Sequence, residues 1–354
     1  MEYRFQSYLS VRINAHGAHQ YDRYFENEYA RINQVCAATT VLDHRMTLEI
    51  VKTLPDDLPA TAIRRKSRFK RLFTFEYAVV GAGTPDVTIF FKDHPVSRIY
   101  VTAVGVFLQA HILEPLMYLS FLKQGVLFMH SAGVSKDGCA YLFPAYGGTG
   151  KTTTCMRLLS RGYGFLGDDL IIVDPKAGLA YPYPRPLHIF TYNVGNLQGA
   201  KIPFRVSALV YFKNALRFIL EGLLRIEFLI STRVHADKIL PDFQLSEPAT
   251  LHNIIFLKKE GESQTISLDN DTIIKENAEI IVRSADLNVS LFDLLDDASK
   301  QSEIEEMEIR VASEMLQKAD YFGFLNTRKI DLDKLETYLS DVETTVKANA
   351  AEAV

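Results

Sequence analysis

Short apolar runs rich in β-branched and aromatic residues alternate with turn-forming residues over the first hundred positions of the chain. Examples are Tyr77–Val80, Val87–Phe91 and Ile99–Thr102, which glycine- or proline-containing turns separate. Runs of this length and composition are typical of strands. We therefore expect residues 1–105 to form a β-rich N-terminal domain that recognises a substrate or partner.

A longer apolar segment follows at Val106–Lys123. It contains Gln109, His111, Glu114 and Pro115, so it falls short of the ~18 uncharged apolar residues that a membrane span requires. The pattern predicts a buried helix, bent at the proline.

After this helix the pattern changes to that of an α/β protein. Val126–Met129 and Ala140–Phe143 are apolar runs typical of buried strands. A glycine-rich turn, a helix over about Lys151–Ser160 and a further strand over Gly164–Val173 are expected next. Strand, glycine-rich loop, helix and strand in this order are typical of a nucleotide-binding core.

The rest of the chain is expected to complete that core. The predicted elements are helices over Phe204–Leu224, most of 287–325 and Lys334–Val346, and strands over Asn253–Leu257 and Lys329–Leu332. We therefore expect a second domain over residues 106–346. Residues 347–354 have little to anchor them and are predicted to form a flexible tail.

Composition and charge narrow the class of protein. The chain has 354 residues, which suggests about two domains, and its 47% hydrophobic and 23% charged residues are ordinary for a globular protein. A net charge of −4 gives no reason to expect a specific nucleic acid or a membrane as partner. Three scattered cysteines and an N-terminus without a signal-peptide pattern favour the reducing cytoplasm.

One short stretch of the N-terminal region is strongly basic. Its six cations in eight residues are Arg64, Arg65, Lys66, Arg68, Lys70 and Arg71. Such a run is usually a solvated strand or loop. The alternative is a docking patch for an acidic or phosphorylated partner.

The segment 145–152, with the sequence AYGGTGKT, matches the phosphate-binding pattern G-x-x-x-x-G-K-[ST] with alanine in the first position. Its glycines let successive amides face an anion, and the following helix points its positive end at the same place. Lys151 can reach the β- and γ-phosphates, and the Thr152 hydroxyl can ligate Mg²⁺. The expected nucleotide-binding residues are Ala145, Tyr146, Gly147, Gly148, Thr149, Gly150, Lys151, Thr152 and Thr153. No N-K-x-D segment follows, so ATP is expected rather than GTP.

Two adjacent acids, Asp168 and Asp169, follow Lys151 by 17 and 18 positions. The carboxyl ends of strands surround the ligand in α/β sheets, and neighbouring residues of an extended chain point to opposite sides. One carboxylate can then face Mg²⁺ while the other faces a different part of the site. The alternative is that the pair simply forms a turn.

Two further residues have open roles on sequence alone. His130 ends the run Val126–Met129 and is most simply read as a structural histidine. Arg185 lies in a proline-rich connection, where it either contacts the acceptor or the transferred phosphate, or is a surface residue of a proline-braced turn.

The order of His130, the 145–152 loop, Arg161-Gly162 and the Asp168-Asp169 pair resembles the HPr kinase/phosphorylase-like family. Within that family the segment is most similar to the free-standing serine and peptide kinases, such as those of lasso-peptide clusters. The resemblance implies an α/β P-loop core of the HPr kinase C-terminal and PEP carboxykinase-like type. It also implies transfer of the γ-phosphoryl group from ATP, with Mg²⁺, to a hydroxyl, here a serine of a peptide or protein.

The resemblance also assigns roles to individual residues. Lys151 would hold the nucleotide phosphates, and Thr152 and Asp169 would hold Mg²⁺. Asp168 would be the general base that takes the proton from the acceptor hydroxyl, and His130 would orient or tune Asp168.

Two other functions remain open at this stage. The first is a kinase of a small hydroxylated metabolite, such as free serine or a polyol. The second is an ATP-binding scaffold without transfer activity, which would present a partner through the basic run. The acid pair favours an enzyme over the scaffold, because a pure binder needs no base near the γ-phosphate. Whether the chain forms a homo-oligomer is also open.

Overall fold

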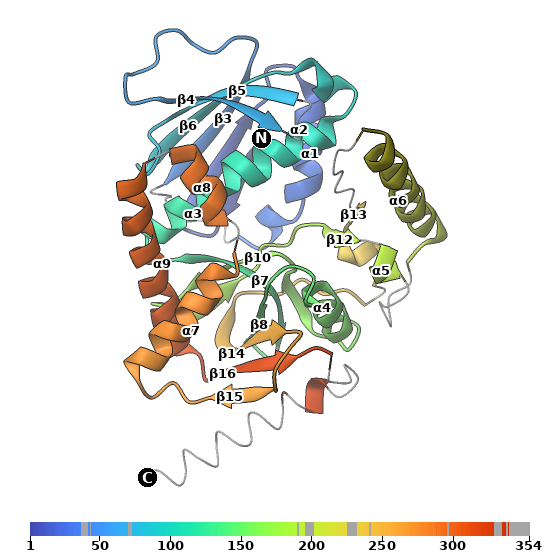
Figure 1. The fold of residues 1–354 in the computed structure, drawn as a ribbon, viewed down its shortest axis with the longest axis vertical. Helices are drawn as coiled ribbons and strands as arrows, with labels where there is room; N and C mark the ends of the chain where they lie inside the picture. The colour runs from blue at the N-terminus through green and yellow to red at the C-terminus, as the bar shows by residue number, and fades with distance from the viewer. Residues whose placement is uncertain are drawn as a thin grey trace.

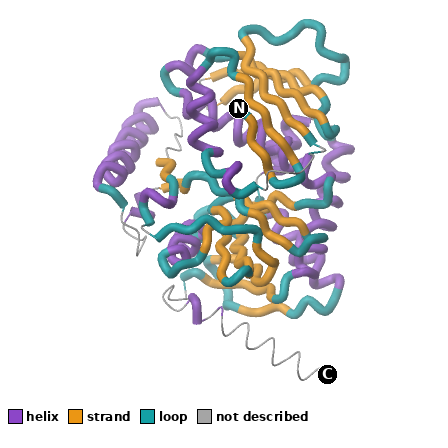
Figure 2. Tube along the Cα trace, turned by 180° about the vertical axis from the view of Figure 1, so that it is seen from behind, coloured by secondary structure: helices purple, strands orange, loops and turns teal. Residues whose placement is uncertain are grey.

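Two large β-sheets organise the described part of the chain, which is mixed α/β (Figure 1). The computed structural model describes residues 1–36, 42, 44–69, 73–189, 191–194, 202–224, 232–240, 242–285, 287–295, 297–328, 335–337 and 339. Figure 2 shows the two sheets from behind, one above the other, with helices at their sides.

The N-terminal sheet has the strand order β1-β2-β3-β6-β5-β4. Its strands are β1 (Glu2–Phe5), β2 (Leu9–Asn14), β3 (Arg45–Val51), β4 (Ile63–Phe69), β5 (Phe73–Val80) and β6 (Asp86–Lys92). One face is apolar and packs on helices α1 (His19–Tyr29) and α2 (Val101–Leu108), where Phe75 and Phe107 place their ring centroids 4.7 Å apart. The predicted β-rich character of this region is confirmed.

One predicted strand of this region is wrong. Ile99 and Tyr100 form the connection after a 3₁₀ turn over Pro95–Arg98, and Val101 and Thr102 begin α2. The segment is helical because its helix buries Val104 and Phe107 against the sheet, and such packing overrides the β propensity of a short run.

A helical run over Val101–Lys123 connects the two sheets. It comprises α2, a π turn over Gln109–Leu113 and α3 (Glu114–Lys123). Proline has no N–H to donate to the carbonyl four residues earlier, which accounts for the irregular turn before Pro115. The run is long and apolar enough to cross a membrane, but most of it is buried, as in a core helix of a soluble protein.

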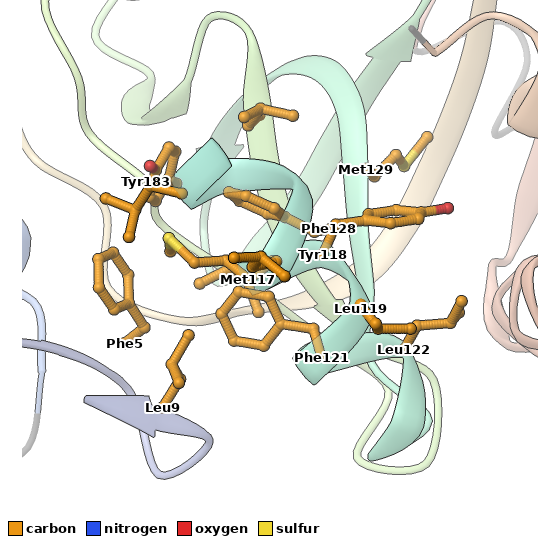
Figure 3. Close-up of a cluster of buried hydrophobic side chains, with 14 of the residues drawn as sticks. Phe5, Leu9, Met117, Tyr118, Leu119, Phe121, Leu122, Phe128, Met129 and Tyr183 are labelled. Carbon is orange, nitrogen blue, oxygen red and sulfur yellow. The ribbon is translucent and has the colours of Figure 1, made fainter. Parts of the chain in front are cut away.

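This run starts five residues earlier than predicted and contains the predicted domain boundary at residue 105. Its apolar side chains join the two sheets in a continuous core (Figure 3). The ring centroids of Phe121 in α3 and Phe128 in the second sheet lie 5.2 Å apart. The ring centroid of Tyr183 lies 4.8 Å from that of Phe128 and 5.8 Å from that of Phe5 in β1. The N-terminal sheet is therefore packed directly against the layer that carries the acid pair.

The second sheet has the order β11-β10-β7-β8-β14-β16-β15, with β9 also paired to β7. Its strands are β7 (Leu127–Lys136), β8 (Cys139–Pro144), β9 (Gly164–Gly167), β10 (Leu170–Asp174), β11 (Leu179–Tyr181), β14 (Ala249–Lys258), β15 (Gln264–Ile266) and β16 (Tyr321–Asn326). Strands β8, β14 and β16 are parallel to one another, and their carboxyl ends lie at one edge.

Helices cover both faces of this sheet. They are α4 (Lys151–Leu159) on one face and α7 (Asp271–Arg283) and α9 (Ala298–Lys318) on the other, while α8 (Leu287–Leu295) packs against α3 and the π turn. The alternation along β14 explains the layers, because Ile255 and Leu257 pack with α4 while Ile254 and Phe256 pack with the opposite core. A small sheet of β12 (Leu187–Ile189) and β13 (Thr232–Val234), with α5 (Thr191–Val194) and α6 (Phe204–Leu224), lies to the side.

Several predicted elements are confirmed and others differ. The strands at Tyr77–Val80, Val87–Phe91 and Asn253–Leu257 and the helices at Lys151–Ser160 and Phe204–Leu224 are present. The single strand predicted over Gly164–Val173 is two strands, and Tyr321–Asn326 is a strand instead of the end of a helical region. Lys70, Arg71, the predicted strand Lys329–Leu332, most of Lys334–Val346 and the tail 347–354 lie outside the described residues.

Candidate functional site

The predicted phosphate loop connects β8 to α4. Ala145 forms a parallel bridge with Leu257 of β14, so the loop leaves the sheet where β8 ends. Thr327, just after β16, donates its hydroxyl to the carbonyl of Thr149 at 2.9 Å. The loop therefore lies over the carboxyl ends of three parallel strands, which is the edge where α/β sheets bind their ligands.

The loop backbone leaves room for an anion. Gly148 and Gly150 have φ angles of 72° and 107°, which favour glycine, and the helix begins directly after them. A Cβ atom added at Gly147 would meet no described atom within 4 Å, and one at Gly148 would lie 3.8 Å from Nζ of Lys259. The first N–H groups of α4 have no acceptor within the helix, so the space above the loop is suited to a phosphate group.

Lys151 lies across the base of this loop. Its Nζ donates to the carbonyl of Ala145 at 2.7 Å and lies 3.0 Å from Nε2 of His130. The lysine that the motif assigns to the phosphates is thus already in contact with the histidine of the neighbouring strand.

His130 joins the loop to the acid pair. It lies on β7, and its Nδ1 is 2.9 Å from the carbonyl of Ser284, which can only accept, so Nδ1 carries a proton. Nε2 then faces Lys151 on one side and Oδ1 of Asp169, at 3.2 Å, on the other. The contact is with Asp169 and not with Asp168, the partner that the resemblance implies.

The acid pair occupies a bend between β9 and β10. The bend requires Gly167, because a Cβ atom there would lie 2.6 Å from the carbonyl oxygen of Leu170. Asp168 turns toward α4, where its Oδ2 accepts a hydrogen bond from Thr152 at 3.0 Å. Asp169 turns toward β7 and Arg185, whose guanidinium lies 3.4 Å from its Oδ2. The two carboxylates thus face different groups.

The surroundings of the two acids also shift their pKa values in opposite directions. Burial, together with the charge of Asp169, raises the pKa of Asp168 to about 7. Burial acts in the same direction on Asp169, but the hydrogen bond and charge of His130 and the charge of Arg185 hold its pKa well below the usual range. Asp169 is therefore ionised at neutral pH, and its side chain is 48% exposed.

Arg185 is a buried anchor of this site. Its side chain is 8% exposed and forms an ion pair with the buried Glu114 of α3 as well as with Asp169. Tyr183 and Gln109 donate to the same carboxylate oxygen of Glu114 at 3.0 and 2.8 Å. The surface alternative for Arg185 is wrong, and its direct partner at the site is an acid.

Sequence reasoning missed Glu114 and His188 as members of the site. Glu114 is a carboxylate within an otherwise apolar helix, and this isolated acid in the sequence could have marked it as a member of the site. His188, on β12, is half-buried, and desolvation together with the charges of Arg233 and Arg185 lowers its pKa to about 4. Asp168, Asp169, Arg185 and His188 help to line a cavity of about 10 Å³, which has room for about one water molecule.

The site fits a magnesium ion that is shared with a nucleotide. The described residues contain no group of three or more His, Cys, Asp or Glu side chains that could hold a metal alone. Magnesium commonly takes one or two carboxylates and completes its shell with phosphate oxygens and water. Oδ1 of Asp168 is buried without a described hydrogen-bond partner, and the Thr152 hydroxyl contacts the same carboxylate. These two side chains supply the oxygen ligands that such an ion needs.

No protein-family model matches this sequence, and no curated protein is detectably similar to it. The contacts of the loop, His130 and the acid pair therefore provide the basis for a functional proposal.

Proposed function

We propose that this protein is an ATP- and Mg²⁺-dependent kinase that transfers the γ-phosphoryl group to the hydroxyl of a serine in a peptide or protein. The observation that carries the proposal is the convergence of the phosphate loop and the acid pair. Thr152 contacts Asp168, and Lys151 contacts His130, which in turn contacts Asp169. An HPr kinase-like P-loop fold for residues 106–346 and a cytoplasmic location belong to the same proposal.

The loop side of the site would hold the nucleotide. Loop amides and the N-terminus of α4 would bind the phosphates, and Lys151 would exchange the Ala145 carbonyl for a phosphate oxygen. Thr152 and Asp168 would hold Mg²⁺, which when bound neutralises charge on the transferred group. A carboxylate beside the loop hydroxyl is the arrangement by which many P-loop proteins bind this ion.

The other side of the site would hold the acceptor. The Asp169 side chain is about half exposed, ionised and fixed in direction by His130 and Arg185, so it can accept a hydrogen bond from an incoming hydroxyl and take its proton. Phosphoryl transfer depends mainly on positioning and charge stabilisation, so a well-placed carboxylate can align the hydroxyl although its pKa lies below the usual range. This proposal exchanges the roles that the resemblance gives to Asp168 and Asp169, because Asp168 is the acid that contacts Thr152.

The shape of the acceptor side favours a polypeptide. The cavity that the acid pair helps to line has room for about one water molecule, which is too small for a metabolite. The Asp169 side chain is about half exposed, so an acceptor hydroxyl can instead approach it from solvent. A serine on an extended segment can do so without being enclosed.

The test is incubation of the protein with ATP and Mg²⁺ and one of two acceptor pools, followed by mass spectrometry. The first pool is a degenerate library of serine-containing peptides, and the second is free L-serine with a set of polyols. The proposal predicts phosphoserine in the peptide pool. Product in the second pool alone would instead identify a metabolite kinase, and bound ATP without product in either would identify a scaffold.

A further inference from the structure

Helix α6 presents its apolar side chains to solvent. The helix lies at the periphery, beside β12, β13 and α5 (Figure 1). Seven of its large apolar side chains are between 38% and 86% exposed: Phe204, Leu209, Tyr211, Phe212, Leu216, Phe218 and Ile219. Soluble proteins seldom expose so many large apolar side chains together unless another molecule covers them.

The polarity of this helix is reversed relative to an ordinary surface helix. Val210 is buried, and the polar side chains of Lys213 and Asn214 are half-buried. Arg205 is the one charged side chain among the α6 residues that the structure describes as exposed. A surface helix normally turns its charged side chains outward and its apolar stripe inward.

The exposed side chains include a stripe with heptad spacing. Phe204, Tyr211 and Phe218 recur at intervals of seven, and Ala208 and Ala215 lie four residues after the first two. All five residues are exposed. Apolar positions in this alternating four-and-three spacing are typical of a face that packs against another helix.

The order of side-chain sizes along the stripe is self-complementary. Large aromatic residues alternate with alanine, and an antiparallel second helix of the same sequence can place each large residue against a small one. Tyr211 of one copy would then face Ala215 of the other, and Ala208 would face Phe218. Alternating large and small residues across a contact gives interdigitated packing without voids.

The exposed area is suited to a dimer. At about 150–250 Å² for each whole aromatic side chain and somewhat less for Leu and Ile, the exposed fractions of the seven residues correspond to about 750 Å². A stable protein–protein interface takes about 800 Å² from each partner. A lipid surface fits less well, because helices that lie on membranes carry many Lys and Arg side chains beside the apolar face, and the described exposed face has Arg205 alone.

We propose that α6 is the interface through which two copies of this chain associate, antiparallel and around a two-fold axis. The proposal is independent of the kinase activity. The partner of α6 is a second copy of the chain, because the same face supplies both the large and the small side chains that the contact needs.

The test is sedimentation equilibrium of the full chain at micromolar concentrations. The wild type should sediment as a dimer of the 40.0 kDa chain. Tyr211→Lys and Phe218→Lys should each raise the dissociation constant at least about 100-fold, because each buries an unpaired charge in the interface. Ile99→Lys, which changes a side chain that is 91% exposed outside α6, is the matched control and should leave the dimer intact.

Far-UV circular dichroism should show all three variants folded, since each replaced side chain is exposed. A monomeric wild type, or dimers unaffected by both α6 variants, would overturn the proposal. So would a monomer that co-sediments with phosphatidylcholine–phosphatidylserine vesicles and loses this binding in the α6 variants, because the face would then bind lipid.

Discussion

The hydroxyl group of Thr152 donates a hydrogen bond to Oδ2 of Asp168 at 3.0 Å. This contact ties the first turn of α4 to the bend between β9 and β10. It turns Asp168 toward the loop and leaves the neighbouring Asp169 at the exposed side, beside His130 and Arg185. The two acids can therefore serve different parts of one reaction.

The first prediction separates the roles of the two acids. Asp168→Asn should raise the Mg²⁺ concentration needed for half-maximal transfer at least about tenfold, because the metal loses a charged ligand. Asp169→Asn should lower kcat by about 10²–10⁴-fold at an unchanged Mg²⁺ requirement, because the acceptor loses its base. Initial rates measured across a Mg²⁺ titration give both quantities. The opposite pattern would restore the assignment that the resemblance implies.

The second prediction concerns nucleotide affinity. Lys151→Ala should weaken the binding of ATP with Mg²⁺ by about 10–100-fold, because a charge-assisted hydrogen bond to a phosphate contributes about 1.5–3 kcal/mol. Titration calorimetry measures the change. Lys300→Ala, which removes an exposed lysine of α9, is the control and should bind as the wild type does. Equal affinity in Lys151→Ala would exclude this lysine from the phosphate site.

The third prediction concerns the anchor beneath the site. Glu114→Gln should lower the free energy of unfolding by about 3–5 kcal/mol, because it leaves the buried guanidinium of Arg185 without its main counter-charge. Glu279→Gln removes the partner of Arg283 in an exposed pair and should cost at most about 1 kcal/mol. Urea denaturation gives the free energy of unfolding of each variant and of the wild type. Similar losses in both would mean that Glu114 has no special structural role.

The fourth prediction concerns pH, without nucleotide or metal. The pKa of Asp168 is about 7 in the folded protein against an ordinary value of 3.8, so between these values the folded state binds more protons than the unfolded state. The contribution of Asp168 to stability is therefore greatest in acid and falls as pH rises through 7. Asp168→Asn cannot ionise, so its stability relative to the wild type should increase from pH 5 to pH 8. Thermal melts at several pH values measure this difference, and a difference independent of pH would contradict the raised pKa.

Local signals in the sequence predicted the loop and the helix after it. The glycines of 145–150 and the position of Lys151 depend only on near neighbours, and α4 begins at the predicted residue. The opposite directions of Asp168 and Asp169 were also expected, but from the geometry of extended chain, whereas the pair lies in a bend between β9 and β10. The contact of His130 with Asp169 did not follow, because it depends on how β7 and β10 pair, a relationship between distant segments.

Two other features could not be predicted, for related reasons. Glu114 comes from α3, and its partner Arg185 is 71 residues away, so nothing local marks them as a pair. The helix at Phe204–Leu224 was predicted from its composition. An apolar stripe is normally assigned to the interior, and only the fold shows that the stripe of α6 faces solvent.

The most direct test of the central claim measures transfer of the γ-phosphoryl group from labelled ATP to the serine-peptide library. The wild type and Lys151→Ala are compared in parallel. We predict label in peptide serine with the wild type and Mg²⁺, at least about tenfold less with Lys151→Ala, and none when EDTA removes the metal. Label transfer that is equal in the two proteins, or a wild type that binds ATP and Mg²⁺ yet labels no hydroxyl, would contradict the proposal.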